Sequence, residues 1–112
     1  MSDTRFALVW CPCESLEEAR RMAHALVGER LVACVNVIGP MLSVFSWNGK
    51  TEEAEEFGLL CKTSHDKMTQ TIARLEQLHK YNTAVIVGWA AEESVPQALA
   101  WLQQALGTGT NR

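Results

Sequence analysis

The sequence predicts a mixed α+β fold, with strands and helices in the order β-α-β-β-α-β and one further helix at the end. Two segments with apolar residues at helical spacing lie between short apolar runs, a pattern typical of helices that alternate with strands. A long β-branched stretch turns back on itself at Asn48-Gly49, a sequence typical of tight β-hairpins. At 112 residues the chain has the length of one domain, which we place at residues 1–112.

The first strand and the first helix follow from the N-terminal part of the chain. The apolar run Phe6–Cys11 should form a central strand that Pro12 ends. Ser15 and Glu18 have the spacing of a capping box, which predicts the start of a helix that continues to about Arg30. The apolar residues that recur on the buried side of this helix are Leu16, Ala19, Met22, Ala23, Leu26 and Val27.

The long hairpin, Leu31–Thr63, is the most informative part of the sequence. We expect a bulge or kink at Gly39-Pro40, because proline cannot donate to the ladder. About 16 extended residues at ~3.3 Å each span roughly 50 Å, whereas a domain of about 100 residues has a radius of gyration near 13 Å. The outer half, with Phe45 and Trp47, should therefore project beyond the core and need cover from another copy of the chain.

A second helix and a fourth strand are expected after the hairpin. Ser64 should cap the helix, and the strand should occupy Ala84–Ala90. This element order is the ferredoxin-like pattern, an antiparallel sheet of four strands with two helices on one face. The buried face of the second helix would consist of Met68, Ile72, Leu75 and Leu78.

An extra C-terminal helix should close the fold. Ser94 should start it, with Pro96 in its first turn, and Gly107 should stop it after Leu106. The tail Thr108–Arg112 is expected to fray. The whole chain is thus accounted for without linkers or repeats.

Composition and charge argue against several classes of function. A net charge of −3 gives no attraction to the phosphates of nucleic acid. The apolar run Phe6–Trp10 is too short for a signal peptide or a membrane span, so we expect a cytoplasmic protein that does not bind membranes. The sequence contains no Gly-rich phosphate loop and no recognisable pair of nucleophile and base, and we expect no enzyme activity.

Cys11 and Cys13 could supply soft sulfur ligands. Thiolates two residues apart in an extended segment can face the same way and suit Cu(I) or Zn(II); a strand-end cysteine beside a chance neighbour gives the same pattern. His79, in the polar loop before the fourth strand, is either another ligand or a solvated side chain near a helix end. Cys34 and Cys61 lie among apolar residues, which predicts buried, inert thiols.

The chain resembles the CutA divalent-cation tolerance family over nearly its whole length. The most specific matches are segment 31–37, the turn Trp47-Asn48-Gly49-Lys50 with the glutamates behind it, Lys62-Thr63, and His79 with Tyr81. The resemblance implies ferredoxin-like homotrimers whose long hairpins pair across subunits, similar to the trimeric PII signalling proteins. It also implies a part in the response to metal ions, with copper binding assigned to some members.

The resemblance further implies which residues would hold a metal. The family's cysteine at the end of the first strand corresponds to Cys11, and its histidine before the fourth strand corresponds to His79. The glutamate assigned to metal binding in some members is replaced by Val85, while Cys13 offers an extra thiolate. A cysteine and a histidine without a third ligand make a poor Cu(II) or Zn(II) site, so we expect weak binding.

Three functions follow from these residues. The first is a cytosolic homotrimeric CutA-like protein that binds copper or another divalent metal weakly near Cys11 and His79. The second is a trimeric PII-like sensor or scaffold, in which Trp47, Lys50 and Tyr81 line a cleft between subunits for a small anionic ligand or a protein partner. The third is a redox or metal-transfer protein built on Cys11 and Cys13.

Overall fold

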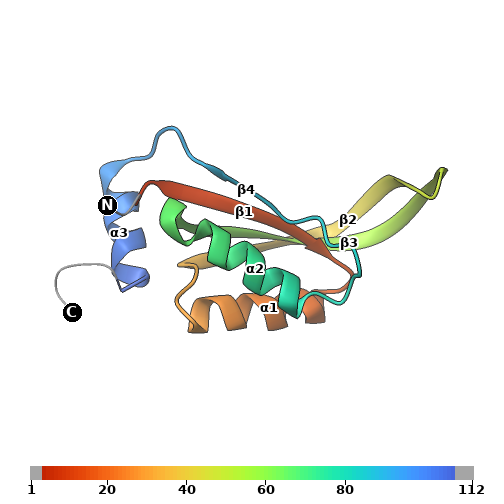
Figure 1. Ribbon diagram of the computed structural model, residues 1–112, viewed down its shortest axis with the longest axis horizontal. Helices are drawn as coiled ribbons and strands as arrows, with labels where there is room; N and C mark the ends of the chain where they lie inside the picture. Colours follow the sequence, from red (N-terminus) through yellow and green to blue (C-terminus); the bar gives the residue numbers. More distant parts are fainter. Residues whose placement is uncertain (1–3, 108–112) are drawn as a thin grey trace.

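The computed structural model describes residues 4–107. Within that range there are three α-helices and four strands, β1 (Phe6–Cys13), β2 (Cys34–Trp47), β3 (Lys50–Ser64) and β4 (Val87–Ala90). The strands form one antiparallel sheet in the order β2-β3-β1-β4, so the predicted α+β class is confirmed. Helices α1 (Leu16–Gly28) and α2 (Met68–Leu78) lie on the same face of the sheet, and α3 (Pro96–Ala105) lies at the end away from the hairpin turn (Figure 1). The tail from Thr108, which we expect to fray, falls outside the described residues.

The core lies between the sheet and helices α1 and α2. Alternate residues of β1 (Phe6–Cys13) face the helices and are fully buried, while the residues between them lie on the open face of the sheet. Apolar side chains of α1, α2 and β3 (Lys50–Ser64) complete the core, among them Met22, Leu26, Leu59 and Leu75. Apolar spacing in the sequence therefore identifies the helix-covered face of the sheet.

Strand β1 is longer than predicted. The sequence predicts that Pro12 ends the strand, but β1 continues to Cys13, with Pro12 opposite Gly58 of β3. Strand β4 (Val87–Ala90) pairs with β1 only opposite residues 7–10. Pro12 therefore lies beyond the part of β1 that is paired on both sides, where a missing N–H is tolerated.

Helix α1 begins at the predicted residue. Ser15 is its N-cap, and the Ser15 hydroxyl oxygen accepts a 3.1 Å hydrogen bond from the backbone N–H of Glu18. Ala19, Met22 and Leu26 are fully buried as expected. Leu16 and Val27, also expected on the buried face, are instead partly exposed, because they lie at the margins of the apolar stripe.

The end of α1 differs from the prediction. The helix stops at Gly28 rather than Arg30, because Arg30 itself adopts a left-handed conformation with φ 58°. The backbone N–H of Leu31 donates to Leu26 O, and that of Arg30 donates to Val27 O. These bonds form a Schellman motif with arginine where glycine is more usual, so the sequence lacks the usual glycine signal at this position.

Ser64 occupies the N-cap position of a different element from the one predicted, and its side chain makes no capping hydrogen bond to the backbone. It precedes a 3₁₀ turn (His65–Lys67) that leads into α2, and its hydroxyl donates to the Asp66 carboxylate. The buried face of α2 is close to the expected one: Leu75 is fully buried, and the other three predicted residues, Met68, Ile72 and Leu78, pack partly buried against the core.

The last strand and helix are shorter than predicted. Strand β4 starts at Val87 rather than Ala84, because the preceding segment leaves the ladder to form the loop described below. The N-cap of α3 is Val95 rather than Ser94, since Pro96 takes the first helical position. Gly107 follows the helix with φ 76°, as expected for a residue that ends it.

The long hairpin projects as predicted. Strand β2 (Cys34–Trp47) pairs with β3 on both sides of Gly39-Pro40, and Asn48 and Gly49 both have positive φ at the turn, 52° and 76°. The molecule measures 51 × 26 × 22 Å, and in Figure 1 the outer half of the hairpin extends past the helices. This half of the ribbon lies outside the layer that α1 and α2 cover.

A bulge at Gly39-Pro40 divides the hairpin into two parts. Ile38 pairs with Gly58 and Met41 with Glu56, so β2 advances three residues while β3 advances two. A Cβ atom on residue 39 would lie only 2.7 Å from an aromatic carbon on β3, so glycine is required. Because side chains alternate along a strand, one extra residue moves all later side chains of β2 to the opposite face.

Gly58 is required by the side chain of Trp10 on the open face of the sheet. A Cβ on residue 58 would lie 2.1 Å from Trp10 Cη2. We expect Gly58→Ala to lower the free energy of unfolding by about 1–3 kcal/mol, the usual cost of overpacking, as measured by urea unfolding. Gly28→Ala is the control, because nothing lies within 4 Å of its Cβ position, and its urea midpoint should be unchanged or higher. Equal midpoints for the two variants would contradict this expectation.

Candidate functional site

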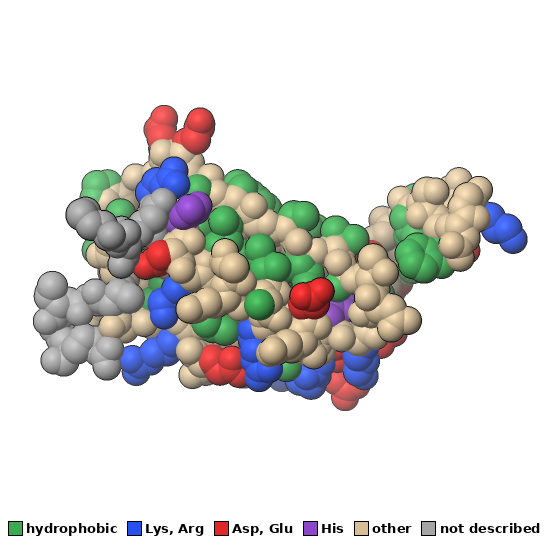
Figure 2. Space-filling model, viewed as in Figure 1, with side chains coloured by type: hydrophobic (Ala, Val, Ile, Leu, Met, Phe, Trp, Pro, Cys, Tyr) green, Lys and Arg blue, Asp and Glu red, His purple; other side chains and the backbone are tan. Residues whose placement is uncertain are grey.

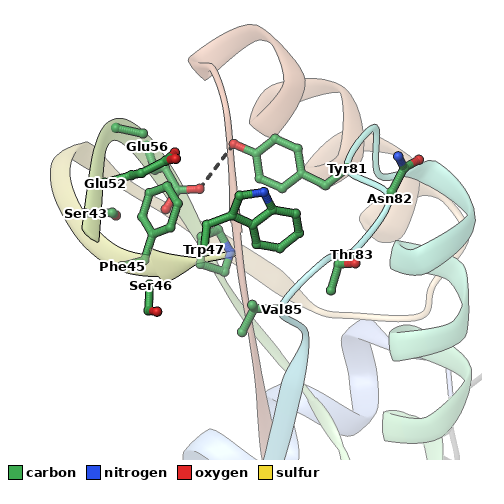
Figure 3. A pocket seen from close by; sticks show the side chains of 12 residues that line it. Ser43, Phe45, Ser46, Trp47, Glu52, Glu56, Tyr81, Asn82, Thr83 and Val85 are labelled. Carbon is green, nitrogen blue, oxygen red and sulfur yellow. Dashed lines mark hydrogen bonds between the residues drawn. The ribbon is translucent and has the colours of Figure 1, made fainter. Parts of the chain in front are cut away.

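A pocket of about 600 Å³ lies between the outer half of the hairpin and the loop that precedes β4. Figure 3 shows Phe45 and Trp47 on the hairpin, opposite Tyr81, Thr83 and Val85 of the loop. Strand β1 contributes its end to the same site. The residues that line the pocket are Pro12, Ser43, Phe45, Ser46, Trp47, Glu52, Ala54, Glu56, Tyr81, Asn82, Thr83 and Val85.

The bulge determines which hairpin side chains reach this pocket. Beyond it, Phe45 pairs with Glu52, and Phe45 and Trp47 share the face that looks toward the loop. Without the extra residue, Leu42 and Val44 would take the positions of this face. The aromatic character of the pocket is therefore a consequence of the register shift at the bulge.

His79 fixes the start of the loop. Its Nδ1 lies 3.1 Å from the backbone N–H of Tyr81, which can only donate, so Nδ1 accepts. In a neutral ring the proton then resides on Nε2, which lies 2.8 Å from Pro12 O and donates to it. The imidazole, which is largely buried, therefore ties the loop to the end of β1 with both of its nitrogens.

Tyr81 connects the loop to the hairpin. Its hydroxyl donates to Glu56 Oε2 at 3.2 Å, and its ring centroid lies 4.7 Å from that of His79. Burial, followed by the negative charge of Glu56, raises the pKa of Tyr81 to about 12. The hydroxyl therefore remains protonated at neutral pH and keeps its role as a donor to the carboxylate.

An ion-pair cluster holds the same loop against α1. The side chain of Glu18 is only 3% exposed and accepts two hydrogen bonds from Arg21, of 3.2 and 2.8 Å. Arg21 also donates to Leu78 O at 2.6 Å, and Lys80 Nζ lies 3.8 Å from Glu18. The hydrogen bonds from Arg21 lower the pKa of the Glu18 carboxyl.

Cys11, Cys13 and Cys61 are buried on the helix-covered side of the sheet. Cys34, predicted to be buried, is only partly buried, because it pairs with Lys62 on the open face of the sheet. Burial, followed by the proximity of Cys61 and Cys13, raises the pKa of the Cys11 thiol to about 12. Burial also raises the pKa values of the Cys13 and Cys61 thiols, the latter to about 12. Within residues 4–107, no group of three or more histidine, cysteine, aspartate or glutamate side chains is arranged to hold a metal ion.

The structure brings together part of the predicted ligand site. Trp47, Tyr81 and Val85 all line the pocket. Among the described residues, Lys50 does not line the pocket, although it pairs with Trp47 at the end of the ladder. His79 hydrogen-bonds to the carbonyl oxygen of Pro12, the residue that follows Cys11 in β1, while the Cys11 side chain lies in the core.

Sequence reasoning missed Phe45, Glu52 and Glu56 as pocket residues. Glutamates at the start of a strand are usually solvated, and Phe45 is expected to need cover from another copy of the chain. A signal for them was nevertheless present, because counting back from the Asn48-Gly49 turn places Phe45 opposite Glu52. The sequence pattern does not show that Tyr81, from a loop distant in the sequence, reaches Glu56.

These features define a class of small α+β proteins in which a projecting hairpin and a loop before the last strand enclose a pocket. Comparison with known proteins specifies the family. Residues 7–105 match the family described as CutA1 divalent ion tolerance protein. The divalent-cation tolerance protein CutA of Thermus thermophilus is 37% identical over 100 residues, which cover 89% of this chain and 95% of the relative.

Solved structures agree with this assignment. CutA from Xylella fastidiosa is 31% identical, covers 94% of this chain and 99% of its own, and superposes with a TM-score of 0.87. The periplasmic divalent cation tolerance protein CutA from Archaeoglobus fulgidus is 33% identical, covers 90% of this chain and 98% of its own, and has a TM-score of 0.86. The chain therefore belongs to the CutA1 divalent ion tolerance family. Among the described residues, no helix is long and apolar enough to cross a membrane.

The Glu18 cluster gives a pH-dependent contribution to stability. Because folding lowers the pKa of this carboxyl, its contribution is complete above the unfolded value of about 4.3 and is lost as the pH falls through the folded value. We expect Glu18→Gln to lower the free energy of unfolding at pH 7 by about 1–3 kcal/mol, with the difference shrinking below about pH 4. Urea unfolding of the wild type and the variant at several pH values measures this difference in free energy. Glu17→Gln, at an exposed position, is the control, and equal losses in both variants would refute the role of the cluster.

Proposed function

We propose that the chain acts as a cytosolic homotrimer of ferredoxin-like, PII-like subunits that takes part in the response to divalent metal ions without catalysing a reaction. The observation that carries the proposal is the apolar surface of the projecting hairpin. Leu42 is 70% exposed and Trp47 is 50% exposed. A concentration of apolar side chains on a projecting ribbon calls for cover by another protein surface. The family resemblance implies that two further copies of the chain provide it.

The open face of the sheet supplies a second apolar surface for this assembly. Trp89 and Val87 of β4 are about half exposed and pair with Leu8 and Trp10 of β1. Figure 2 shows hydrophobic side chains along the body of the molecule and again on the hairpin. Such a surface supports subunits that pack with their sheets toward one another while each hairpin lies against a neighbour.

Weak copper binding near Cys11 and His79 is a second element of the proposal. The hydrogen bond between His79 and Pro12 O supports it, because it holds the imidazole next to the residue that follows Cys11. Coordination requires His79 to give up a hydrogen bond and the Cys11 thiol, with its raised pKa, to lose a proton. Val85 supplies no ligand. These requirements favour weak rather than tight binding.

The geometry gives less support to the alternative functions. An anionic ligand in the pocket would meet the carboxylates of Glu52 and Glu56 without the help of Lys50. A redox or metal-transfer role for Cys11 and Cys13 requires accessible thiolates, whereas burial raises the pKa of both thiols. We therefore retain assembly and weak metal binding as the proposed properties.

Trp47→Ala tests the assembly. Truncation of an aromatic anchor at an interface should raise the dissociation constant of the trimer by at least about tenfold, while the urea midpoint of the dissociated chain changes less. Sedimentation velocity over a dilution series measures this constant. Trp101→Ala on α3 is a matched control, because Trp101 is similarly exposed at the opposite end of the molecule. A monomeric wild type, or a trimer that is unaffected by Trp47→Ala, would overturn the assembly proposal.

Copper titration tests the metal site separately. We expect isothermal titration of the wild type to show weak binding, and His79→Ala and Cys11→Ser each to weaken it by about tenfold. Cys34→Ser is the control, since Cys34 lies on β2, outside the proposed site, and its affinity should equal that of the wild type. If neither site variant changes the affinity while circular dichroism shows both to be folded, the proposed ligands are wrong.

A further inference from the structure

The open face of the sheet carries one unpaired positive charge. Lys62 lies on this face because it pairs with Leu8, whose neighbours Ala7 and Val9 are buried under the helices. Among the described strand residues up to the bulge, every other side chain on the open face is uncharged. In the part of the chain that the structure describes, the Lys62 ammonium makes no hydrogen bond or ion pair. Subunits that pack with their open faces together would enclose this charge without a counterion, which is unfavourable.

Carboxylates lie farther along the same side of β3. The extra residue of the bulge belongs to β2, so the alternation of β3 is unbroken and Glu52, Glu56 and Lys62 face one side of the ribbon. Glu56 and Lys62 are six residues apart on this strand, about 20 Å at ~3.3 Å per residue, so they cannot form an ion pair within one chain. One side of each chain therefore presents a cation at one end and carboxylates at the other.

These carboxylates belong to the pocket beside the hairpin. Glu52 and Glu56 line it together with the rings of Phe45, Trp47 and Tyr81. Among the described residues, those that line the pocket include no lysine, arginine or histidine. Figure 3 shows the Trp47 indole between Phe45 and Tyr81. Because another copy of the chain covers Trp47 in the proposed trimer, the group that enters this pocket must come from that copy.

We propose that the Lys62 side chain of one subunit enters the hairpin pocket of the next, where Glu52 and Glu56 neutralise its charge. The pairing rests on the proposed trimer and specifies a contact between its subunits. A cation on one part of the chain and its acceptor on another form a heterologous interface, which closes into a ring under threefold rotation. Each subunit then inserts one lysine into a neighbour and receives one from the other neighbour.

The pocket accommodates both parts of a lysine side chain. The aliphatic stem of a lysine packs on apolar surface while its charge stays with polar groups, and the Trp47 indole provides such a surface. The face of the indole also attracts the cation. Glu56 accepts one hydrogen bond from the Tyr81 hydroxyl, which leaves most of its acceptor positions open for the ammonium. The apolar open face around Lys62 supplies the cover that the exposed indole needs.

Reversal of the charge at Lys62 tests the pairing. Lys62→Glu would add a third carboxylate to the pocket of the neighbouring subunit, and it should raise the dissociation constant of the trimer by at least about tenfold. Sedimentation velocity over a dilution series measures this constant, and circular dichroism checks that the variant is folded. Lys62→Gln, which removes the charge only, should raise the constant by about threefold or more. Arg20→Glu is the matched control, because Arg20 is exposed on α1, on the other side of the sheet, and its trimer should dissociate like the wild type.

A second reversal identifies the partner of Lys62. Glu52→Lys in the Lys62→Glu protein exchanges the two charges, and it should restore the dissociation constant to within about threefold of the wild-type value. Glu53 pairs with Val44 on the opposite face of the hairpin. Glu53→Lys in the same background gives the same net charge but should not restore the trimer. Rescue by one of these neighbouring glutamates and not by the other requires a specific contact between subunits.

The possible outcomes separate the pairing from the assembly itself. If the wild type is a trimer and Lys62→Glu leaves its dissociation constant unchanged, the pairing is wrong and the assembly stands. If Glu52→Lys fails to restore the trimer, or Glu53→Lys restores it equally, Lys62 acts through another group or through net charge, and the pairing is again wrong. A monomeric wild type overturns both the assembly and the pairing.

Discussion

The one-residue bulge at Gly39-Pro40 is the constraint on which the surface chemistry of this protein depends. It leaves the pairing of β2 with β3 intact on both sides but reverses the side chains of β2 beyond it. Phe45 and Trp47 consequently face the loop, and Leu42 and Val44 face the other way. The absence of a Cβ at Gly39 allows the close approach to β3 that this geometry requires.

The loop before β4 is held by contacts that reach three parts of the fold. His79 bonds to the end of β1, and Tyr81 bonds to Glu56 on β3. Glu18 and Arg21 on α1 reach the residues at the end of α2. These contacts hold the loop in place, although most of it pairs with no strand. The pocket that the loop lines is therefore preformed.

Local patterns predicted much of the fold, and long-range contacts account for what they missed. The Ser15 cap, the turn at Asn48-Gly49 and the alternating burial of β1 are each decided by neighbouring residues, and the sequence predicts them correctly. The continuation of β1 through Pro12 depends on how far β4 extends, which no local pattern reveals. Likewise, the site could be only half predicted, because Tyr81 meets Glu56 across 25 residues of chain.

The double hydrogen bonding of His79 has a consequence for spectroscopy. One ring nitrogen accepts from the loop while the other donates to a strand carbonyl, so the two nitrogens should give well separated ¹⁵N resonances. Displacement of Tyr81 by an occupant of the pocket would alter the Nδ1 signal first. The imidazole is therefore a native reporter, through which the state of the neighbouring loop can be followed without an added label.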